Sequence, residues 1–222
     1  MSEIFSLKRI TTLPTNKVEC FKTYFNKESK DIYIYLGLKS GKVMLYQFKP
    51  EDKSPNPTNL TYKLYREDSI QISKKKISKI VLIPDFKRIL LLANGELLSL
   101  DMFTLKPVYL SLQIDTIYDF YVDSISSVYS RVCFVNKKKI QIFNFDNQKM
   151  EFFIDFNIQS PPTTLLFTRD TIYMGSKDGY IVIDIISKSG HQFQGQLKSS
   201  SAPCISYMPN GSVLVNQNND IL

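Results

Sequence analysis

Residues 34–45 read IYLGLKSGKVML, and residues 172–183 read IYMGSKDGYIVI. Aligned without a gap, the two stretches share an isoleucine, a tyrosine, a lysine and two glycines. Each is an apolar run, a short turn that ends in Gly41 or Gly179, and a second apolar run, which is typical of an antiparallel β-hairpin. Glycine suits the end of such a turn because it adopts positive φ without steric cost. The chain therefore repeats a hairpin.

Weaker copies of this hairpin occur elsewhere. They are LLLANGELLSLD at Leu90–Asp101, VCFVNKKKIQIF at Val132–Phe143 and SVLVNQNNDIL at Ser212–Leu222. The turns then fall near positions 41, 95, 137, 179 and 219, roughly 40 residues apart except for one wider gap. That gap contains EDKSPNPTN at Glu51–Asn59, whose proline, asparagine and charged residues predict a surface insertion.

Further strand candidates flank each hairpin, for example KISKIVLIP before the second and KMEFFIDF later in the chain. Four short strands per unit of about 40 residues are typical of β-propeller blades, whereas helical repeats of similar length need a helical periodicity. We therefore predict an all-β chain, a β-propeller of four-stranded antiparallel blades. The predicted blades span residues 17–66, 77–112, 116–156 and 163–197, and a fifth begins at Pro203.

A count of about four and a half blades predicts an incomplete propeller. We interpret residues 1–222 as a single propeller domain, truncated at its C-terminal end, that forms the N-terminal part of a longer protein. The alternative is a small ring whose last blade is shared between the termini, with Ile4–Arg9 as the closing strand. An unclosed propeller leaves sheet edges that can recruit other strands.

The formal net charge is +7, and the lysines are dense at two places. The candidate basic contact residues are Lys74, Lys75, Lys76, Lys137, Lys138 and Lys139. They either contact phosphate or lipid headgroups or are solvent-facing lysines that protect strand edges. We expect no nucleic-acid partner. The apolar runs are far shorter than the roughly 20 residues that span a bilayer.

No enzymatic chemistry is expected. His191 is the only histidine, and its surroundings, SKSGHQFQG, offer neither a nucleophile nor a metal-ligand pattern. P-loop, G-x-S-x-G and H-E-x-x-H motifs do not occur in the sequence. We therefore expect no catalytic residues, no cofactor and no metal. Cys20, Cys133 and Cys204 lie in strand-like runs and are interpreted as buried small hydrophobes of a protein in a reducing compartment.

Aromatic residues are abundant, with 13 Tyr and 15 Phe, but Trp is absent, which argues against the WD-repeat type of propeller. Two clusters are dense: TIYDFYVD at Thr116–Asp123 and KMEFFIDF at Lys149–Phe156. Such clusters either form exposed binding patches or alternate between the two faces of a blade. We interpret both as alternation.

Four stretches carry a family resemblance. They are IYLGLKSGKVMLYQF, KKKISKIVLIPDFKRILLLANGELLSLDMFTLKPV, RVCFVNKKKIQIFNF and TIYMGSKDGYIVIDIISKSG. In order and spacing they resemble the citron-homology (CNH) domain over about Val18–Leu222. The likeness is greatest to the N-terminal propeller of vacuolar sorting tether subunits, the Vam-six and TGF-β-receptor-associated group of the HOPS and CORVET complexes. The second stretch is the most telling, with Lys76-Ile77, Ile83-Pro84, Asn94-Gly95 and Leu100-Asp101.

The resemblance implies a non-enzymatic interaction scaffold that acts in vesicle docking and fusion. It further implies a cytoplasmic protein, peripheral on late endosome, vacuole or lysosome membranes. The implied partners are other tethering-complex subunits, a small Rab GTPase and a membrane contact, and both HOPS and CORVET membership stay open. A propeller that starts close to Met1 favours the tether branch, because in kinases and Rho exchange factors the catalytic region precedes the CNH domain. The alternatives are the regulatory CNH propeller of such a signalling protein and a basic phosphoinositide-binding module.

Overall fold

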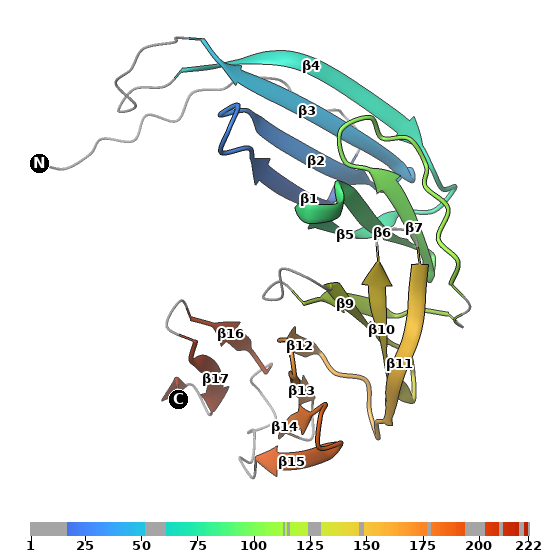
Figure 1. The fold of residues 1–222 in the computed structure, drawn as a ribbon, viewed down its shortest axis with the longest axis vertical. Helices are drawn as coiled ribbons and strands as arrows, with labels where there is room; N and C mark the ends of the chain where they lie inside the picture. The colour runs from blue at the N-terminus through green and yellow to red at the C-terminus, as the bar shows by residue number, and fades with distance from the viewer. Residues whose placement is uncertain are drawn as a thin grey trace, which may run out of the picture. The chain divides into compact units, whose positions relative to one another are not determined.

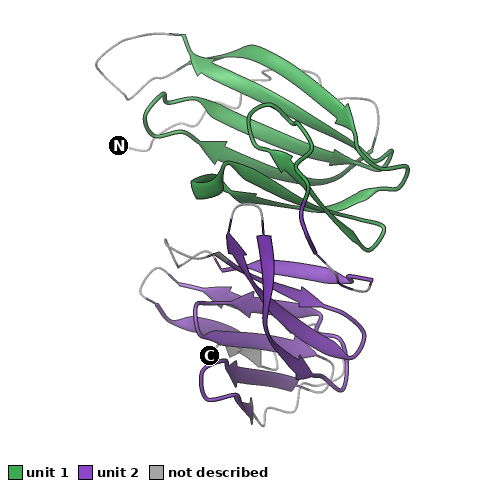
Figure 2. Ribbon diagram, turned by 45° about the vertical axis from the view of Figure 1, so that its right-hand side comes forward, with its two compact units in different colours: residues 1–109 green, residues 110–222 purple. Residues whose placement is uncertain are grey.

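The computed structural model describes part of the chain in detail. The described residues are 17–51, 61–112, 114, 116–123, 130–146, 149–176, 179–193, 203–208, 211–217 and 220–221. The chain divides into two compact units, residues 1–109 and 110–222 (Figure 2). The predicted closing strand Ile4–Arg9 lies outside the described residues, as does the predicted insertion after Glu51. The single domain over residues 1–222 remains a prediction.

Unit 1 contains two antiparallel sheets (Figure 1). The first sheet consists, in order, of β1 (Val18–Phe25), β2 (Ile32–Leu38), β3 (Lys42–Pro50) and β4 (Tyr62–Gln71). The second sheet consists of β5 (Ile77–Ile83), β6 (Arg88–Ala93) and β7 (Glu96–Asp101), with the 3₁₀ helix η2 (Pro84–Phe86) between β5 and β6.

Unit 2 continues the antiparallel pattern. The third sheet consists of β8 (Asp119–Val122), β9 (Ser130–Val135), β10 (Lys139–Asp146) and β11 (Lys149–Asn157). The fourth sheet consists of β12 (Thr164–Phe167), β13 (Thr171–Ser176), β14 (Gly179–Asp184) and β15 (Ser189–Phe193). The fifth sheet consists of β16 (Ile205–Tyr207), β17 (Val213–Gln217) and β18 (Asp220–Ile221). The predicted all-β architecture is confirmed, and the sheets follow the predicted units.

The second sheet departs from the prediction of four regular strands. The segment after β7 pairs with it through an isolated bridge between Leu100 and Pro107. Two backbone hydrogen bonds of 2.9 Å accompany the bridge, from Asp101 N to Lys106 O and from Val108 N to Ser99 O. Pro107 has no N–H to donate, so a regular ladder cannot continue through it. The fourth strand of this unit is therefore reduced to a short contact.

The turn glycines behave as the repeat predicts. Gly41, Gly95 and Gly179 have φ values of 83°, 80° and 116°. Asn94 precedes Gly95 with a φ of 53°, so both central residues of that turn are left-handed, as a tight hairpin requires. The turn predicted near position 137 is also present, and Asn136 closes it with its side-chain oxygen 2.8 Å from Lys139 N. The turn near position 219 lies outside the described residues.

Each unit has its core between neighbouring sheets. In unit 1 the facing side chains of the first and second sheets are Tyr33, Tyr35, Val43, Leu45, Ile77, Ile80, Ile89, Leu91, Ala93 and Leu100. In unit 2 those of the third and fourth sheets are Cys133, Val135, Ile140, Ile142, Leu165, Phe167, Ile172, Met174 and Ile183. The first sheet is also apolar on its other face, where Leu36, Leu38, Met44, Tyr46 and Phe48 are buried. Strands that are apolar on both faces read as continuous runs rather than as alternation, which explains IYLGL and VMLY in the sequence.

Candidate interaction surfaces

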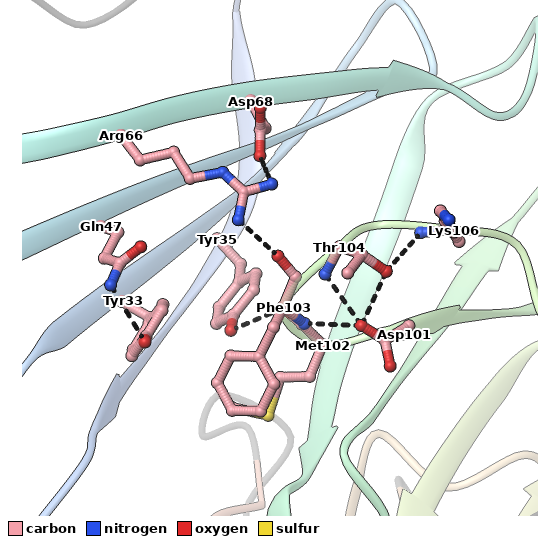
Figure 3. A network of polar contacts seen from close by, with 10 residues as sticks. All are labelled: Tyr33, Tyr35, Gln47, Arg66, Asp68, Asp101, Met102, Phe103, Thr104 and Lys106. Atoms are coloured by element: carbon pink, nitrogen blue, oxygen red, sulfur yellow. Dashed lines mark hydrogen bonds and ion pairs between the residues drawn. The ribbon is translucent and has the colours of Figure 1, made fainter. Parts of the chain in front are cut away.

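A network of polar contacts fastens the turn after β7 to the first sheet (Figure 3). Asp101 Oδ1 accepts hydrogen bonds from Phe103 N at 3.0 Å, and from the backbone N and hydroxyl of Thr104 at 2.8 Å each. Burial alone would raise the pKa of Asp101, but these hydrogen bonds outweigh it and lower the pKa below its usual value. The Asp101 carboxylate therefore stabilises the conformation of this turn.

Two side chains of the first sheet donate hydrogen bonds to the backbone of this turn. The fully buried Tyr35 donates its hydroxyl to Met102 O at 3.0 Å, and Arg66 Nη1 donates to Phe103 O at 3.3 Å. Burial raises the pKa of Tyr35, so the phenol stays protonated and remains a donor. Arg66 also forms an ion pair with Asp68 on the same strand. These contacts hold two sheets together and leave the engaged groups unsuited to acid–base work.

A buried carboxylate lies in the same part of the first sheet. Asp31 Oδ2 accepts hydrogen bonds from Gln47 Nε2 at 2.8 Å and from the Tyr33 hydroxyl at 3.4 Å. Burial and the neighbouring Asp31 raise the pKa of Tyr33. The Tyr33 ring also packs against Phe103 with ring centroids 5.3 Å apart. Asp31, Tyr33 and Gln47 thus provide hydrogen-bond partners for one another, as expected for buried polar side chains.

Lys74, Lys75 and Lys76 are exposed in the turn between β4 and β5 in unit 1. The backbone of this turn lies against the first hairpin, because Ile72 N and Ser73 N both donate to Gly41 O at 3.2 Å. Lys76 Nζ lies 3.8 Å from Glu19, so part of its charge is compensated. No hydrogen bond or ion pair of the Lys74 side chain is found among the described residues.

Lys137, Lys138 and Lys139 occupy the β9–β10 turn in unit 2. Together with Thr116, Tyr118 and Asn136 they line an open hollow of about 440 Å³. Lys137 Nζ lies 5.9 Å from the centroid of the Tyr118 ring, and Lys139 Nζ donates to Asp155 Oδ2 at 2.7 Å. The two predicted lysine clusters therefore belong to different compact units.

The other residues considered for chemistry have structural surroundings. His191 is exposed on β15, opposite Val182. Cys133 is buried, and Cys20 is half-buried and donates its thiol to Ile77 O at 3.3 Å. Burial raises the pKa of Cys20 to about 11, which keeps the thiol neutral. Cys204 is exposed, so the prediction that all three cysteines are buried is wrong. The residue is exposed because it precedes a short strand of the three-stranded fifth sheet.

Among the described residues, no group of acidic, histidine and cysteine side chains is arranged to hold a metal ion. In the same part of the chain, no helix is long and apolar enough to cross a membrane.

The interpretation of KMEFFIDF as simple alternation is wrong at its centre. Phe152 and Phe153 are consecutive, yet their exposed fractions are 57% and 43%. The cause is a β-bulge: Phe143 pairs with Phe152 and Ile142 pairs with Ile154, so Phe153 is an extra residue in β11. The consecutive phenylalanines were the available sequence signal, because a regular half-buried strand does not place two large apolar residues side by side.

The comparisons with known proteins agree with this architecture. The family model of the CNH domain matches residues 30–220. A solved structure titled "AfRom2 CNH domain" is similar with a TM-score of 0.59 and 18% sequence identity, over 91% of this chain and 66% of that chain. Among curated proteins, none matches the sequence.

The similarity to the solved structure supports a fold of the β-propeller type, as predicted. The family match covers most of the chain and spans both compact units. The predicted resemblance to the CNH domain is thereby confirmed. The chain belongs to the CNH domain family, a family of protein-interaction modules.

Proposed function

We propose that this CNH domain is a non-enzymatic interaction scaffold, the N-terminal propeller of a subunit of an endosomal or vacuolar tethering complex. Its partners are other subunits of that complex and a small Rab GTPase, and it assists vesicle docking before fusion. It works on the cytoplasmic side of late endosome, vacuole or lysosome membranes. The observation that carries the scaffold function is the family match over residues 30–220.

The tether branch is supported by the resemblance carried by Lys76–Asp101. In the structure, several positions of this motif build the blade. Ile77 packs against Gly37, Pro84 begins η2, and Asn94 and Gly95 form the hairpin turn. Asp101 organises the turn that follows. The motif thus specifies the structure of the blade, and the exposed surfaces around this motif bind the partner.

Binding to Rab GTPases tests the proposal directly. The purified protein is titrated against a panel of endosomal and vacuolar Rab GTPases, each loaded with GTP analogue or with GDP, and binding is followed by calorimetry. We expect at least one GTPase to bind about tenfold more tightly in its GTP form. Equal affinity for both nucleotide forms across the panel, or no binding to any of them, contradicts the Rab version of the function.

A second candidate function, phosphoinositide binding, is favoured by the hollow beside Lys137 and Lys138. Clustered lysines near a membrane attract anionic lipids, with about 1 kcal/mol for each basic residue. Lys139 also lines this hollow but is already paired with Asp155, so Lys137 and Lys138 carry the expected effect.

Liposome flotation separates the two clusters. The double variant Lys137→Ser/Lys138→Ser is expected to reduce flotation with phosphoinositide vesicles. Lys74→Ser/Lys75→Ser removes the same charge from the other turn and is expected to retain flotation. Equal behaviour of both variants and the unaltered protein removes this candidate.

A further inference from the structure

The outer edge of the third sheet is formed by β11, whose sequence is KMEFFIDFN. At its first residue, Lys149, this edge forms an isolated parallel bridge with Ser111, and no further pairing along it is found among the described residues. On one side of the bulge, Phe152 packs edge-on against Phe143, with ring centroids 5.6 Å apart at 81°. Phe143 in turn packs against Phe134, and Phe134 against Phe120. The half-exposed Phe152 is therefore the outer end of a row of rings that runs back into buried parts of the sheet.

Phe153 is held by a different contact. The guanidinium carbon of Arg131 lies over its ring, 4.6 Å from the centroid. Because Phe143 and Ile142 are successive residues of β10, their partners Phe152 and Ile154 lie on opposite faces of the sheet. The bulged Phe153 lies between them. Two fixed aromatic rings thus flank the part of the β11 edge that follows the bridged Lys149. Rings that are already fixed lose little entropy when a partner binds.

The first sheet supplies an internal comparison. Its outer strand β4 has a bulge at the corresponding place: Phe48 pairs with Leu64, Gln47 pairs with Arg66, and Tyr65 is the extra residue. Tyr65 is 63% exposed, and Lys49 Nζ lies 3.5 Å from its ring centroid. The two sheets therefore share an outer bulge that carries an aromatic residue under a cation.

The residues that follow the two bulges differ. In β4 they are Arg66, Glu67 and Asp68, three charged residues that discourage pairing with another chain although Arg66 and Asp68 form an ion pair with each other. In β11 they are Ile154, Asp155 and Phe156, and the charge of Asp155 is compensated by Lys139. Glu151, on the other side of the bulge, is exposed and has no ion pair among the described residues. Charged residues thus protect the edge of β4 more than the edge of β11.

We infer that the edge of β11 is a docking site for an extended segment of a partner protein, which adds to the third sheet as a further strand. This inference deepens the proposed scaffold function and rests on it. Backbone groups of the added strand pair with those of β11, and apolar side chains meet Phe152 and Phe153. Glu151 selects a segment that carries a lysine or arginine opposite it, because unlike charges on neighbouring strands attract.

Selection from a displayed library of random linear peptides tests the inference. Peptides are selected on the unaltered protein, and the enriched sequences are synthesised and titrated by fluorescence anisotropy. We expect apolar residues at alternate positions and one basic residue in the enriched peptides. Phe152→Lys should weaken their binding about tenfold or more, as expected for an anchor residue. Tyr65→Lys, the matched change in the first sheet, should leave binding unchanged.

Two further measurements guard against a folding defect and against a contact that involves only side chains. The variants Phe153→Ser and Glu151→Lys, whose folding is checked by circular dichroism, should also weaken binding. Glu151→Lys should in addition favour a peptide whose basic residue is replaced by glutamate. Methylation of alternate peptide amides in one register should abolish binding, because strand addition needs these N–H groups. Methylation in the other register should be tolerated.

Peptides that bind Phe152→Lys as tightly as the unaltered protein overturn the assignment to β11 while leaving the scaffold function intact. A library that yields no enriched peptide also overturns it. Failure of the scaffold function itself shows separately, in the GTPase titration.

Discussion

Gly37 of β2 and Ile77 of β5 touch so closely that a Cβ atom added to Gly37 would lie 2.8 Å from Ile77 Cγ2. Gly175 of β13 is equally close to the segment that leads into the fifth sheet, because a Cβ atom added to Gly175 would lie 2.6 Å from Pro203 Cβ. These are the equivalent glycines of the two repeated stretches. The repeat therefore preserves a place where the next sheet approaches the hairpin, as well as the hairpin itself.

The substitution Gly37→Ala should destabilise the protein by about 1–3 kcal/mol, since the added methyl overpacks a closed contact. Cys20 Sγ adds to the clash, because it would lie 2.6 Å from the new Cβ. Urea unfolding followed by circular dichroism measures the effect.

Gly190→Ala is the matched control. At Gly190 the nearest side-chain atom to a new Cβ is Ile183 Cγ1 at 3.9 Å, which is ordinary van der Waals contact. Its free energy of unfolding should change by less than about 0.5 kcal/mol. Equal losses for the two variants would show that steric contact with Ile77 is not what requires Gly37.

The sheets were predictable because their signals are local. The turn glycines Gly41, Gly95 and Gly179 each lie between two apolar strands and so mark a hairpin. The regular spacing of these hairpins follows from one strand pattern repeated along the chain. The blade predicted at residues 116–156 corresponds to β8–β11, which ends at Asn157.

The bulges were not predictable in the same way. Tyr65 and Phe153 are extra residues only relative to their partner strands β3 and β10, and register with a partner is not a local property of β4 or β11. The lysine clusters show the same limit. The sequence predicted that these lysines lie in turns. It did not predict that the charges of Lys76 and Lys139 are compensated by ion pairs with acidic residues of other strands.

Asp101→Ala should destabilise the protein by about 1.5–3 kcal/mol near neutral pH, because three donors lose their charged acceptor. The folded-state pKa of Asp101 is lowered, so the ionised carboxylate stabilises the folded state above the pKa of the unfolded chain. This contribution is lost as the pH falls through the lower folded-state pKa. The difference in unfolding free energy between the variant and the unaltered protein should therefore shrink below about pH 4.

Urea unfolding at several pH values measures this difference. Glu96→Ala, which removes an exposed carboxylate from the same strand, is the control and should change stability by less than about 0.5 kcal/mol. A difference between Asp101→Ala and the unaltered protein that stays constant into acid would contradict the role of the ionised form.

The three cysteines should react with iodoacetamide at very different rates. Cys204 is exposed and should be alkylated readily, whereas Cys133 is buried and should be protected. Cys20 should also react slowly, because burial raises its pKa to about 11 and the thiolate is the reactive form. Mass spectrometry of peptides after timed labelling measures the rates. All three should react alike in denaturant, and rapid native labelling of Cys20 would argue against the buried, neutral thiol.

A cavity of about 230 Å³ lies between the fourth and fifth sheets, lined mainly by apolar side chains that include Ile181, Val182, Val213 and Val215. Val182→Ile adds one methylene next to this space and should stabilise the protein by about 0.8 kcal/mol. Val132→Ile makes the same change where the side chain is fully buried in the third sheet, and overpacking should cost about 1–3 kcal/mol there. Thermal and urea unfolding of the two variants measure the contrast. Loss of stability in both would mean that the space beside Val182 cannot accept a methyl group, and that the fourth and fifth sheets pack more tightly than the cavity indicates.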